Sequence, residues 1–175
     1  MKKFPLFTVL VVIGLGCGTA AQAQGEQETS SIASAIASST RFGCWGSTIA
    51  LRVSTGHFVV AEGGGGREVR ADRARIGPWE TLRVYEVGDN KVAFQVANGS
   101  FVVAERGGGD VLLANRPWIG PWEMFSIERH WNGVSWAIRA NSGAYVVAEG
   151  GGGREVNANR PGVGPWEAFD VVCLD

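Results

Sequence analysis

The sequence predicts an all-β domain built from three repeats of four strands, closed into a barrel. Two observations predict this fold: one pattern occurs three times without a gap, and apolar residues alternate at the start of each repeat. The three copies are FVVAEGGGGREVRADRARIGPWETL at 58–82, FVVAERGGGDVLLANRPWIGPWEMF at 101–125 and YVVAEGGGGREVNANRPGVGPWEAF at 145–169. Their first aromatic residues set a period of about 43–44 residues, a length typical of repeat architectures.

The first half of each repeat predicts two strands joined by a tight turn. Apolar residues lie two apart, as in a half-buried strand, at Ile49, Leu51 and Val53, at Val92, Phe94 and Val96, and at Trp136, Ile138 and Ala140. The turns 54–56, 97–99 and 141–143 follow, each ending in a glycine that suits a positive φ. The second strand is FVVAE or YVVAE, with the aromatic residue and the second valine expected on one face.

The glycine tracts 63–66, 107–109 and 150–153 predict wide hairpin loops. A phosphate-binding loop is excluded, because no Lys-Ser or Lys-Thr follows the glycines and the next segment is a strand, not a helix. The third strand ends in Ala-Asp-Arg or Ala-Asn-Arg, and a turn leads to Gly-Pro-Trp-Glu at 77–80, 120–123 and 164–167. The Trp and the next apolar residue are three apart, so a bulge or turn is expected there. Closing twelve such strands into a barrel capped by hairpins removes exposed strand edges.

The N-terminus predicts a signal peptide over residues 1–23. Lys2 and Lys3 precede a short apolar run at 4–16, and Ala21-Gln22-Ala23 fits a cleavage site after Ala23. The run is short for a membrane span. A lipoprotein anchored at Cys17 is the alternative. Residues 24–42 are small and polar and predict a flexible linker, which leaves 43–175 as the repeated domain.

The signal peptide predicts an exported protein, and the charge of the remaining chain predicts no nucleic-acid partner. Without residues 1–23 the chain has 14 basic and 17 acidic residues, so no basic surface is predicted. The protein is expected to be secreted or periplasmic. Cys44 and Cys173 then form an even pair that flanks the repeats, which favours a disulfide, although two separate thiols are the alternative. Closing a loop this long stabilises a fold by roughly 4–5 kcal/mol in the chain-entropy model.

The repeated pattern resembles the fascin-like domain. The resemblance rests on aromatic-x-x-Ala-Glu-x-Gly-Gly-Gly, then Ala-Asn-Arg, then Gly-x-Trp-Glu-x-Phe, and it covers residues from about 49 to 171. It implies a β-trefoil with pseudo-threefold symmetry, a fold that hosts many sugar-binding and protein-binding modules. Fascins bundle actin with several trefoils in one chain, whereas this chain has one trefoil and a signal peptide. No actin-binding residue is transferred, because the shared motif is the part that builds the trefoil.

Three sets of residues recur at equivalent places and have two interpretations. They are Trp79, Trp122 and Trp166; Glu80, Glu123 and Glu167; and Arg73, Arg116 and Arg160. In the first interpretation the tryptophans close the barrel, while the Arg and Glu side chains satisfy loop backbone or one another. In the second, the three corners are shallow ligand sites in which Asp72, Asn115 and Asn159, each beside its Arg, bind sugar hydroxyls.

Residues that differ between the repeats are the other candidates for a binding site. Trp118 stands where the other repeats have Arg75 and Gly162, so its indole is a candidate for stacking on a sugar or a partner. Trp131, in the connection 129–133, is a second candidate and is placed in the same patch. The alternative for Trp118 is a local cover over an underlying strand.

The sequence predicts a binding module rather than an enzyme. His57 and His130 have no counterparts and lie in no catalytic motif, so no buried histidine is expected beside a nucleophile. No metal site and no cofactor are predicted. Carbohydrate on a surface or an extracellular polymer is the expected ligand. The alternatives are a protein surface, including actin filaments, and a small hydrolase on a trefoil scaffold.

Overall fold

A computed structural model describes residues 42–44 and 47–174. The predicted signal peptide, Cys17 and the predicted linker up to residue 41 lie outside these residues. Repeat 1 contains β1 (Thr48–Arg52), β2 (Phe58–Ala61), β3 (Val69–Arg73) and β4 (Leu82–Glu86). Repeat 2 contains β5 (Lys91–Gln95), β6 (Phe101–Val103), β7 (Leu113–Arg116) and β8 (Phe125–Arg129). Repeat 3 contains β9 (Trp136–Arg139), β10 (Tyr145–Ala148), β11 (Val156–Arg160) and β12 (Asp170–Cys173).

The first and fourth strands of the repeats form a closed barrel. Antiparallel pairs join β1 to β4, β4 to β5, β5 to β8, β8 to β9 and β12 to β1. A bridge between Trp136 and Phe169 completes the ring between β9 and the start of β12. Closure leaves the barrel without a free edge, which is the physical advantage of repeating the same unit around an axis.

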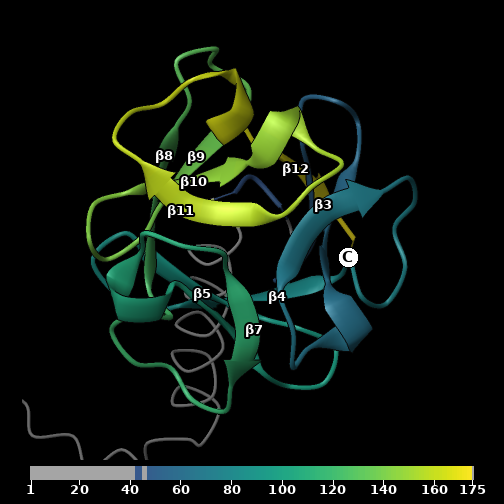
Figure 1. Ribbon diagram of the computed structural model, residues 1–175, viewed down its shortest axis with the longest axis vertical. Coiled ribbons are helices and arrows are strands. Elements are labelled where there is room, and N and C mark those ends of the chain that lie inside the picture. The colour runs from purple at the N-terminus through teal and green to yellow at the C-terminus, as the bar shows by residue number, and fades with distance from the viewer. Residues whose placement is uncertain (1–41, 45–46, 175) are drawn as a thin grey trace, which may run out of the picture. The chain divides into compact units, whose positions relative to one another are not determined.

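The second and third strands form three hairpins that cap the barrel. β2 pairs with β3, β6 with β7 and β10 with β11. The third strands also contact one another in a ring: the Val69 N–H donates to the Leu112 carbonyl, and the Leu112 N–H donates to the Val156 carbonyl, each at 2.8 Å. Figure 1 shows β3, β7 and β11 around a common centre. The fold is therefore a β-trefoil, as predicted.

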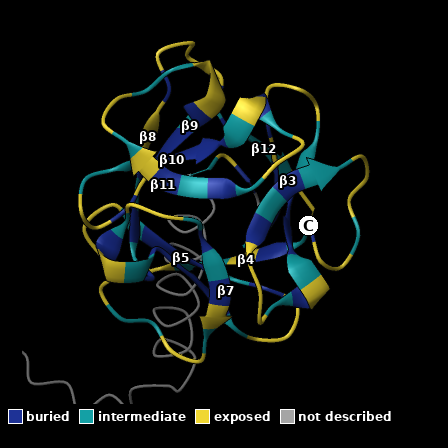
Figure 2. Cartoon of the chain, in the orientation of Figure 1, coloured by how far each residue is buried: buried dark blue, intermediate teal, exposed yellow. Residues whose placement is uncertain are grey.

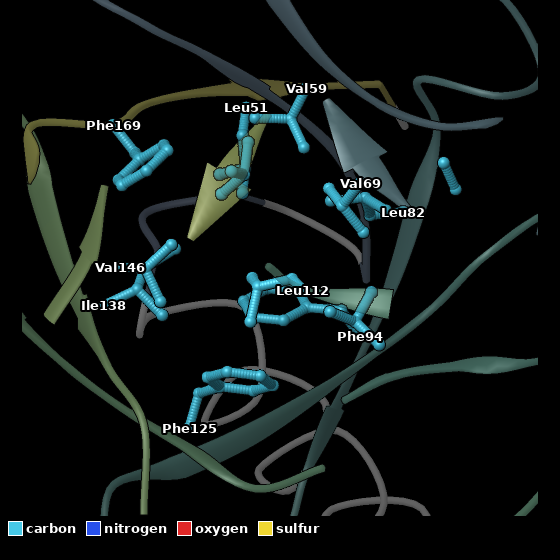
Figure 3. A pocket seen from close by; sticks show the side chains of 13 residues that line it. Leu51, Val59, Val69, Leu82, Phe94, Leu112, Phe125, Ile138, Val146 and Phe169 are labelled. Atoms are coloured by element: carbon cyan, nitrogen blue, oxygen red, sulfur yellow. The ribbon is translucent and has the colours of Figure 1, made fainter. Parts of the chain in front are cut away.

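The core lies on the pseudo-threefold axis and is entirely apolar. Phe125 and Phe169 come from equivalent places at the start of fourth strands, and Phe94 comes from the first strand β5; all three point toward one centre (Figure 3), and each is at most 3% exposed. The space left between the core side chains is only about 30 Å³ and has apolar walls, so it is an imperfection of packing and not a ligand site. Buried residues follow the strands, whereas most exposed residues lie in the connections (Figure 2).

The second strands are buried on both faces, which simple alternation does not predict. Val59 joins the central core and Val60 is fully buried outside that core. A register shift between Phe58 and Val60 marks a bulge in β2. The Gly-Pro-Trp-Glu segment lies against this strand, since the Ala61 N–H donates to the Trp79 carbonyl at 3.1 Å.

Each glycine tract begins with a short 3₁₀ turn and contacts the tight turn of another repeat. These elements are η1 (Glu62–Gly64), η2 (Glu105–Gly107) and η3 (Glu149–Gly151), and η4 (Pro165–Glu167) forms the last Gly-Pro-Trp-Glu turn. The carbonyls of Gly64, Gly107 and Gly151 accept hydrogen bonds from the N–H groups of Asn98, Ser142 and Thr55, at 3.0, 2.9 and 3.3 Å. The glycine tracts therefore form contacts between repeats. The turn predicted at each Gly-Pro-Trp-Glu tryptophan is confirmed.

The two ends of the domain are joined covalently. Cys44 and Cys173 form the predicted disulfide, with 5.4 Å between their Cα atoms and a separation of 129 positions in sequence. Phe42, the last residue of the predicted linker, packs edge-on against Trp136 with ring centroids 5.2 Å apart. The packed domain thus includes Phe42. Within the described ranges, no helix is long and apolar enough to cross a membrane.

Candidate functional site

The outer face of the barrel has three equivalent junctions, where the start of a fourth strand lies between two first strands. Asp170 stands at one junction, paired with Arg52 of β1. Ser126 stands at the second, between Lys91 and Arg139. Arg83 stands at the third. The backbone positions are the same, yet one carries an acid, one a hydroxyl and one a base. Threefold symmetry of the fold therefore does not extend to the chemistry of its surface.

A hollow of about 390 Å³ lies at the Asp170 junction. Its walls come from the turn after β1, the connection between β8 and β9, η4 and the start of β12. The lining residues are Ser54, His130, Trp131, Asn132, Val134, Ser135, Pro165, Ala168 and Asp170.

One wall of the hollow is formed by the connection between β8 and β9, which contains one extra residue. Phe101 follows Phe58 by 43 residues, whereas Tyr145 follows Phe101 by 44. The extra residue lies in the connection between β8 and β9, because Val92 follows Leu82 by 10 positions and Trp136 follows Phe125 by 11. This connection is therefore longer than its counterpart between β4 and β5.

Asn132 holds the longer connection in shape. Its Oδ1 accepts hydrogen bonds from the N–H groups of Val134 and Ser135, at 3.0 and 2.9 Å, and its Nδ2 donates to the Ser135 Oγ at 2.9 Å. Local amide bonds of this kind stabilise a turn that has no ladder partners. As a result Trp131 and Val134 stand outward at the rim, each 73% exposed.

The floor of the hollow is polar and ordered. The Ser135 hydroxyl, only 4% exposed, donates to Asp170 Oδ1 at 2.6 Å, and Arg52 donates to Asp170 Oδ2 at 3.1 Å. A carboxylate oxygen accepts more than one hydrogen bond, so Asp170, whose side chain is 35% exposed, keeps acceptor capacity toward the hollow. The floor therefore offers fixed acceptors beside an exposed indole.

His130, which the sequence places in no catalytic motif, is buried in this loop. It is 3% exposed, and its ring lies 4.9 Å from that of Trp131. Its Nε2 is 3.0 Å from the Gly164 carbonyl, and its Nδ1 accepts the Asn132 N–H at 3.3 Å. Both nitrogens thus contact backbone, while the nearby Ser135 hydroxyl donates to Asp170 instead. A general base has to reach the proton of its nucleophile, and this geometry does not provide that contact.

The three arginines that end the third strands form ion pairs within their own repeats. Arg73, Arg116 and Arg160 pair with Glu62, Glu105 and Glu149. Each guanidinium Nε also lies 3.7–3.8 Å from a buried glutamate, namely Glu80, Glu123 or Glu167. Those glutamates accept the N–H of Gly77, Gly120 and Gly164 at 2.7–2.8 Å. The expected pairing of Arg and Glu with loop backbone and with one another is therefore present.

The amide and carboxylate groups at these corners are also engaged or lie away from the hollow. Asp72 accepts hydrogen bonds from Arg73 at 2.6 Å and from Arg70 at 2.9 Å, and the second bond raises the pKa of Arg70. Asn159 Oδ1 accepts from Arg160 at 2.8 Å. Asn115 is exposed, and none of these residues lines the hollow at Asp170.

The tryptophans of the Gly-Pro-Trp-Glu turns do not close the barrel. Trp79, Trp122 and Trp166 are 44, 40 and 45% exposed. The barrel is already filled by its phenylalanines and branched aliphatics, so the indoles lie outside, and those of Trp79 and Trp166 lie against glycine tracts. A Cβ on Gly64 would be 3.0 Å from the Trp79 Nε1, which shows how close the indole comes to that backbone.

Of the two candidate tryptophans, only Trp131 lines the hollow at Asp170. Trp118 is 71% exposed in the connection between β7 and β8, and it is not among the residues that line the hollow. Sequence reasoning found Trp131 but missed Asn132, Ser135 and Asp170. The one-residue difference in repeat spacing was the available signal for the unusual loop.

The part of the chain described here has no cluster of three or more His, Cys, Asp or Glu side chains suited to a metal ion.

Comparisons with known proteins give a family match and a match of fold. The family model described as "Domain of unknown function (DUF7910)" matches residues 46–146, which is more than half of the chain. No curated protein matches. Among solved structures, the designed 3-fold symmetric protein ThreeFoil matches with a TM-score of 0.65 and 16% identity, over 73% of this chain and 99% of that chain. At this identity the likeness shows the β-trefoil fold alone.

Proposed function

We propose that the chain, which belongs to the DUF7910 family, is a non-enzymatic binding module that recognises carbohydrate at the hollow beside Trp131. The observation that carries the proposal is an indole, 73% exposed, that lines the same hollow as the hydrogen-bonded groups Ser135 and Asp170. A sugar ring has an apolar face and a polar rim, and this arrangement offers a partner for each.

The indole is held in place before a ligand arrives. Trp131 contacts the buried His130 ring, and Asn132 fixes the backbone on its C-terminal side through two accepted hydrogen bonds. A preorganised side chain loses less conformational entropy on binding than a mobile one. The exposed face of Trp131 is therefore suited to stacking on a ligand.

The polar groups of the floor match the rim of a sugar. Asp170 retains acceptor capacity, and the exposed Asn132 side chain keeps the second of its two Nδ2 N–H donors, because the first donates to the Ser135 Oγ. The volume of about 390 Å³ lies within the usual range for small-ligand sites. The hollow is open at the surface, so we expect weak binding to a single sugar and stronger retention on a polymer that presents many copies.

A glycan array with two matched variants tests this proposal. Trp131→Ala removes the indole at the hollow, and Trp118→Ala removes an indole of nearly equal exposure, 71% against 73%, from another loop. Loss of a stacking aromatic costs roughly 1–3 kcal/mol, so we expect Trp131→Ala to lower affinity for a bound glycan about tenfold or more. Trp118→Ala should leave it unchanged.

Two results would overturn the assignment. If the wild-type protein binds no glycan, the carbohydrate function is wrong. If Trp118→Ala abolishes binding and Trp131→Ala does not, the site lies in the connection between β7 and β8 instead.

A protein-binding role is the second candidate, favoured by the exposure of Trp118 outside the hollow. The resemblance to fascin-like domains makes actin filaments one partner to test by cosedimentation. We propose no catalytic role, because His130 is not hydrogen-bonded to the Ser135 hydroxyl. Export to the periplasm or the exterior is also proposed, and the disulfide between Cys44 and Cys173 supports it.

A further inference from the structure

The junction at Ser126 has a second hollow, of about 280 Å³, with the opposite electrostatic character. Ser126 takes the place that Asp170 has in the first hollow, and Lys91 takes the place of Ser135. Arg139 corresponds to Arg52. No acidic side chain lines this hollow, whose other walls are Met124, Ala140 and residues 141–143.

The guanidinium of Arg139 is fixed in position at the edge of this hollow. Its Nε donates to the Gly143 carbonyl at 2.7 Å, and its Cζ lies 5.4 Å from the centre of the Tyr145 ring. These two contacts orient the planar group while using one of its five N–H donors. The remaining donors are therefore presented in a defined geometry.

The positive charge of this hollow is not neutralised by an ion pair. Within the described part of the chain, neither Lys91 nor Arg139 has a carboxylate oxygen within 4.0 Å, unlike Arg52, Arg73, Arg116 and Arg160. Glu128 lies further along β8, outside the lining, and accepts the Tyr145 hydroxyl at 2.7 Å. That hydrogen bond raises the pKa of Tyr145. Two cations thus share a concave surface with the hydroxyl and amide donors of Ser126, Asn141 and Ser142.

We infer that this hollow binds an oxyanion, a sulfate or carboxylate group carried by an acidic sugar. Charge-assisted hydrogen bonds to an oxyanion are about twice as strong as neutral ones, and Arg is suited to bidentate contact. The site shares no lining residue with the hollow at Trp131, so it stands independently of carbohydrate stacking there. The two hollows are at neighbouring junctions and both use the β9 region, through Ser135 and Arg139.

Titration calorimetry on the purified protein tests the inference with three probes: inorganic sulfate, a monosaccharide sulfate and a hexuronic acid. Ionic strength is held constant with sodium chloride, because exposed charges are screened by salt. The variant Lys91→Gln with Arg139→Gln should bind the recognised probe about tenfold more weakly or worse, since it removes two charge-assisted contacts. Arg83→Gln, which removes a cation at the third junction, should bind as the wild type does.

Trp131→Ala should also keep oxyanion binding, which separates this site from the carbohydrate site. Preference for the sulfated or the carboxylated sugar identifies the natural group. No binding of either sugar by the wild-type protein overturns the inference, and binding of inorganic sulfate alone means an adventitious ion only. An equal loss with Arg83→Gln would show attraction by net charge rather than by this hollow. If the double variant fails to fold, Lys91→Gln alone supplies the same comparison.

Discussion

At the scale of single residues, the glycine tracts are required for docking between repeats rather than for flexibility. Gly152 has φ +135°, a conformation that side chains with a Cβ rarely adopt. Its neighbour Gly151 accepts the Thr55 hydroxyl at 2.8 Å, so this tract lies directly on the turn after β1. The sequence indicates a loop here, but only the contact with repeat 1 explains why the backbone has to come so close.

Gly152→Ala should therefore destabilise the fold. The added Cβ would lie 2.2 Å from the Thr55 Oγ1 and 2.9 Å from a methyl group of the buried Val53. Backbone strain and overpacking together predict a loss of about 2–4 kcal/mol in the free energy of unfolding. Gly162→Ala is the matched control, because nothing lies within 4 Å of its new Cβ, and it should change stability by less than about 0.5 kcal/mol. Urea unfolding measures both, and equal effects would contradict the docking role.

At the scale of elements, the Gly-Pro-Trp-Glu turn is fixed by its glutamate and not by its tryptophan. Glu123 is 4% exposed, accepts the Gly120 N–H at 2.7 Å and lies 3.7 Å from the Arg116 Nε. Burial of a carboxylate is tolerated only when its hydrogen bonds and charge are satisfied. The same arrangement recurs at Glu80 and Glu167, which makes it a property of the repeat.

Glu123→Ala should cost about 1–3 kcal/mol in the free energy of unfolding, because it leaves the partly buried Gly120 N–H without its acceptor. Glu123→Gln should cost less, since an amide oxygen can still accept that hydrogen bond. Glu68→Ala serves as the control: its side chain is 51% exposed and its ion pair with Arg70 is long, at 3.7 Å. Chemical denaturation compares the three variants. If Glu68→Ala destabilises the protein as much as Glu123→Ala does, then Glu123 has no special role in fixing the turn.

At the scale of the whole molecule, the trefoil is closed twice, by hydrogen bonds and by a covalent bond. β12 pairs with β1, and the disulfide joins Cys173 of β12 to Cys44, ahead of β1. Three similar repeats bring the chain ends together because the last repeat packs against the first. The disulfide therefore restrains the unfolded chain without requiring a new arrangement of the folded one.

Replacing Cys44 and Cys173 with alanine should lower the free energy of unfolding by about 2–5 kcal/mol while the trefoil still forms. Guanidinium unfolding, followed by tryptophan fluorescence, measures the change. The wild-type protein unfolded in a reducing agent should approach the stability of the double variant. Equal stability of oxidised wild type and variant would show that the disulfide adds nothing.

The sequence predicts the parts of the fold that depend on local pattern. Alternation predicts β1, β5 and β9, and the Gly-Pro-Trp-Glu motif predicts a turn before each fourth strand. It does not predict that Val60 is buried outside the core or that Trp79 is half exposed. Both depend on which segment covers which face, and that is decided by packing between segments distant in sequence.

The candidate sites also combine features that the sequence determined with features that only tertiary packing determined. Repetition of one pattern in the sequence determined the β-trefoil, because the same local instructions build the same four strands three times and the barrel closes without edges. Only the tertiary structure decided that Trp131 and Asp170 line one hollow, and that Lys91 lines the same hollow as Arg139. These partners come from different strands and connections. They meet at the junctions of the barrel, where symmetry of the backbone leaves each side chain free to differ.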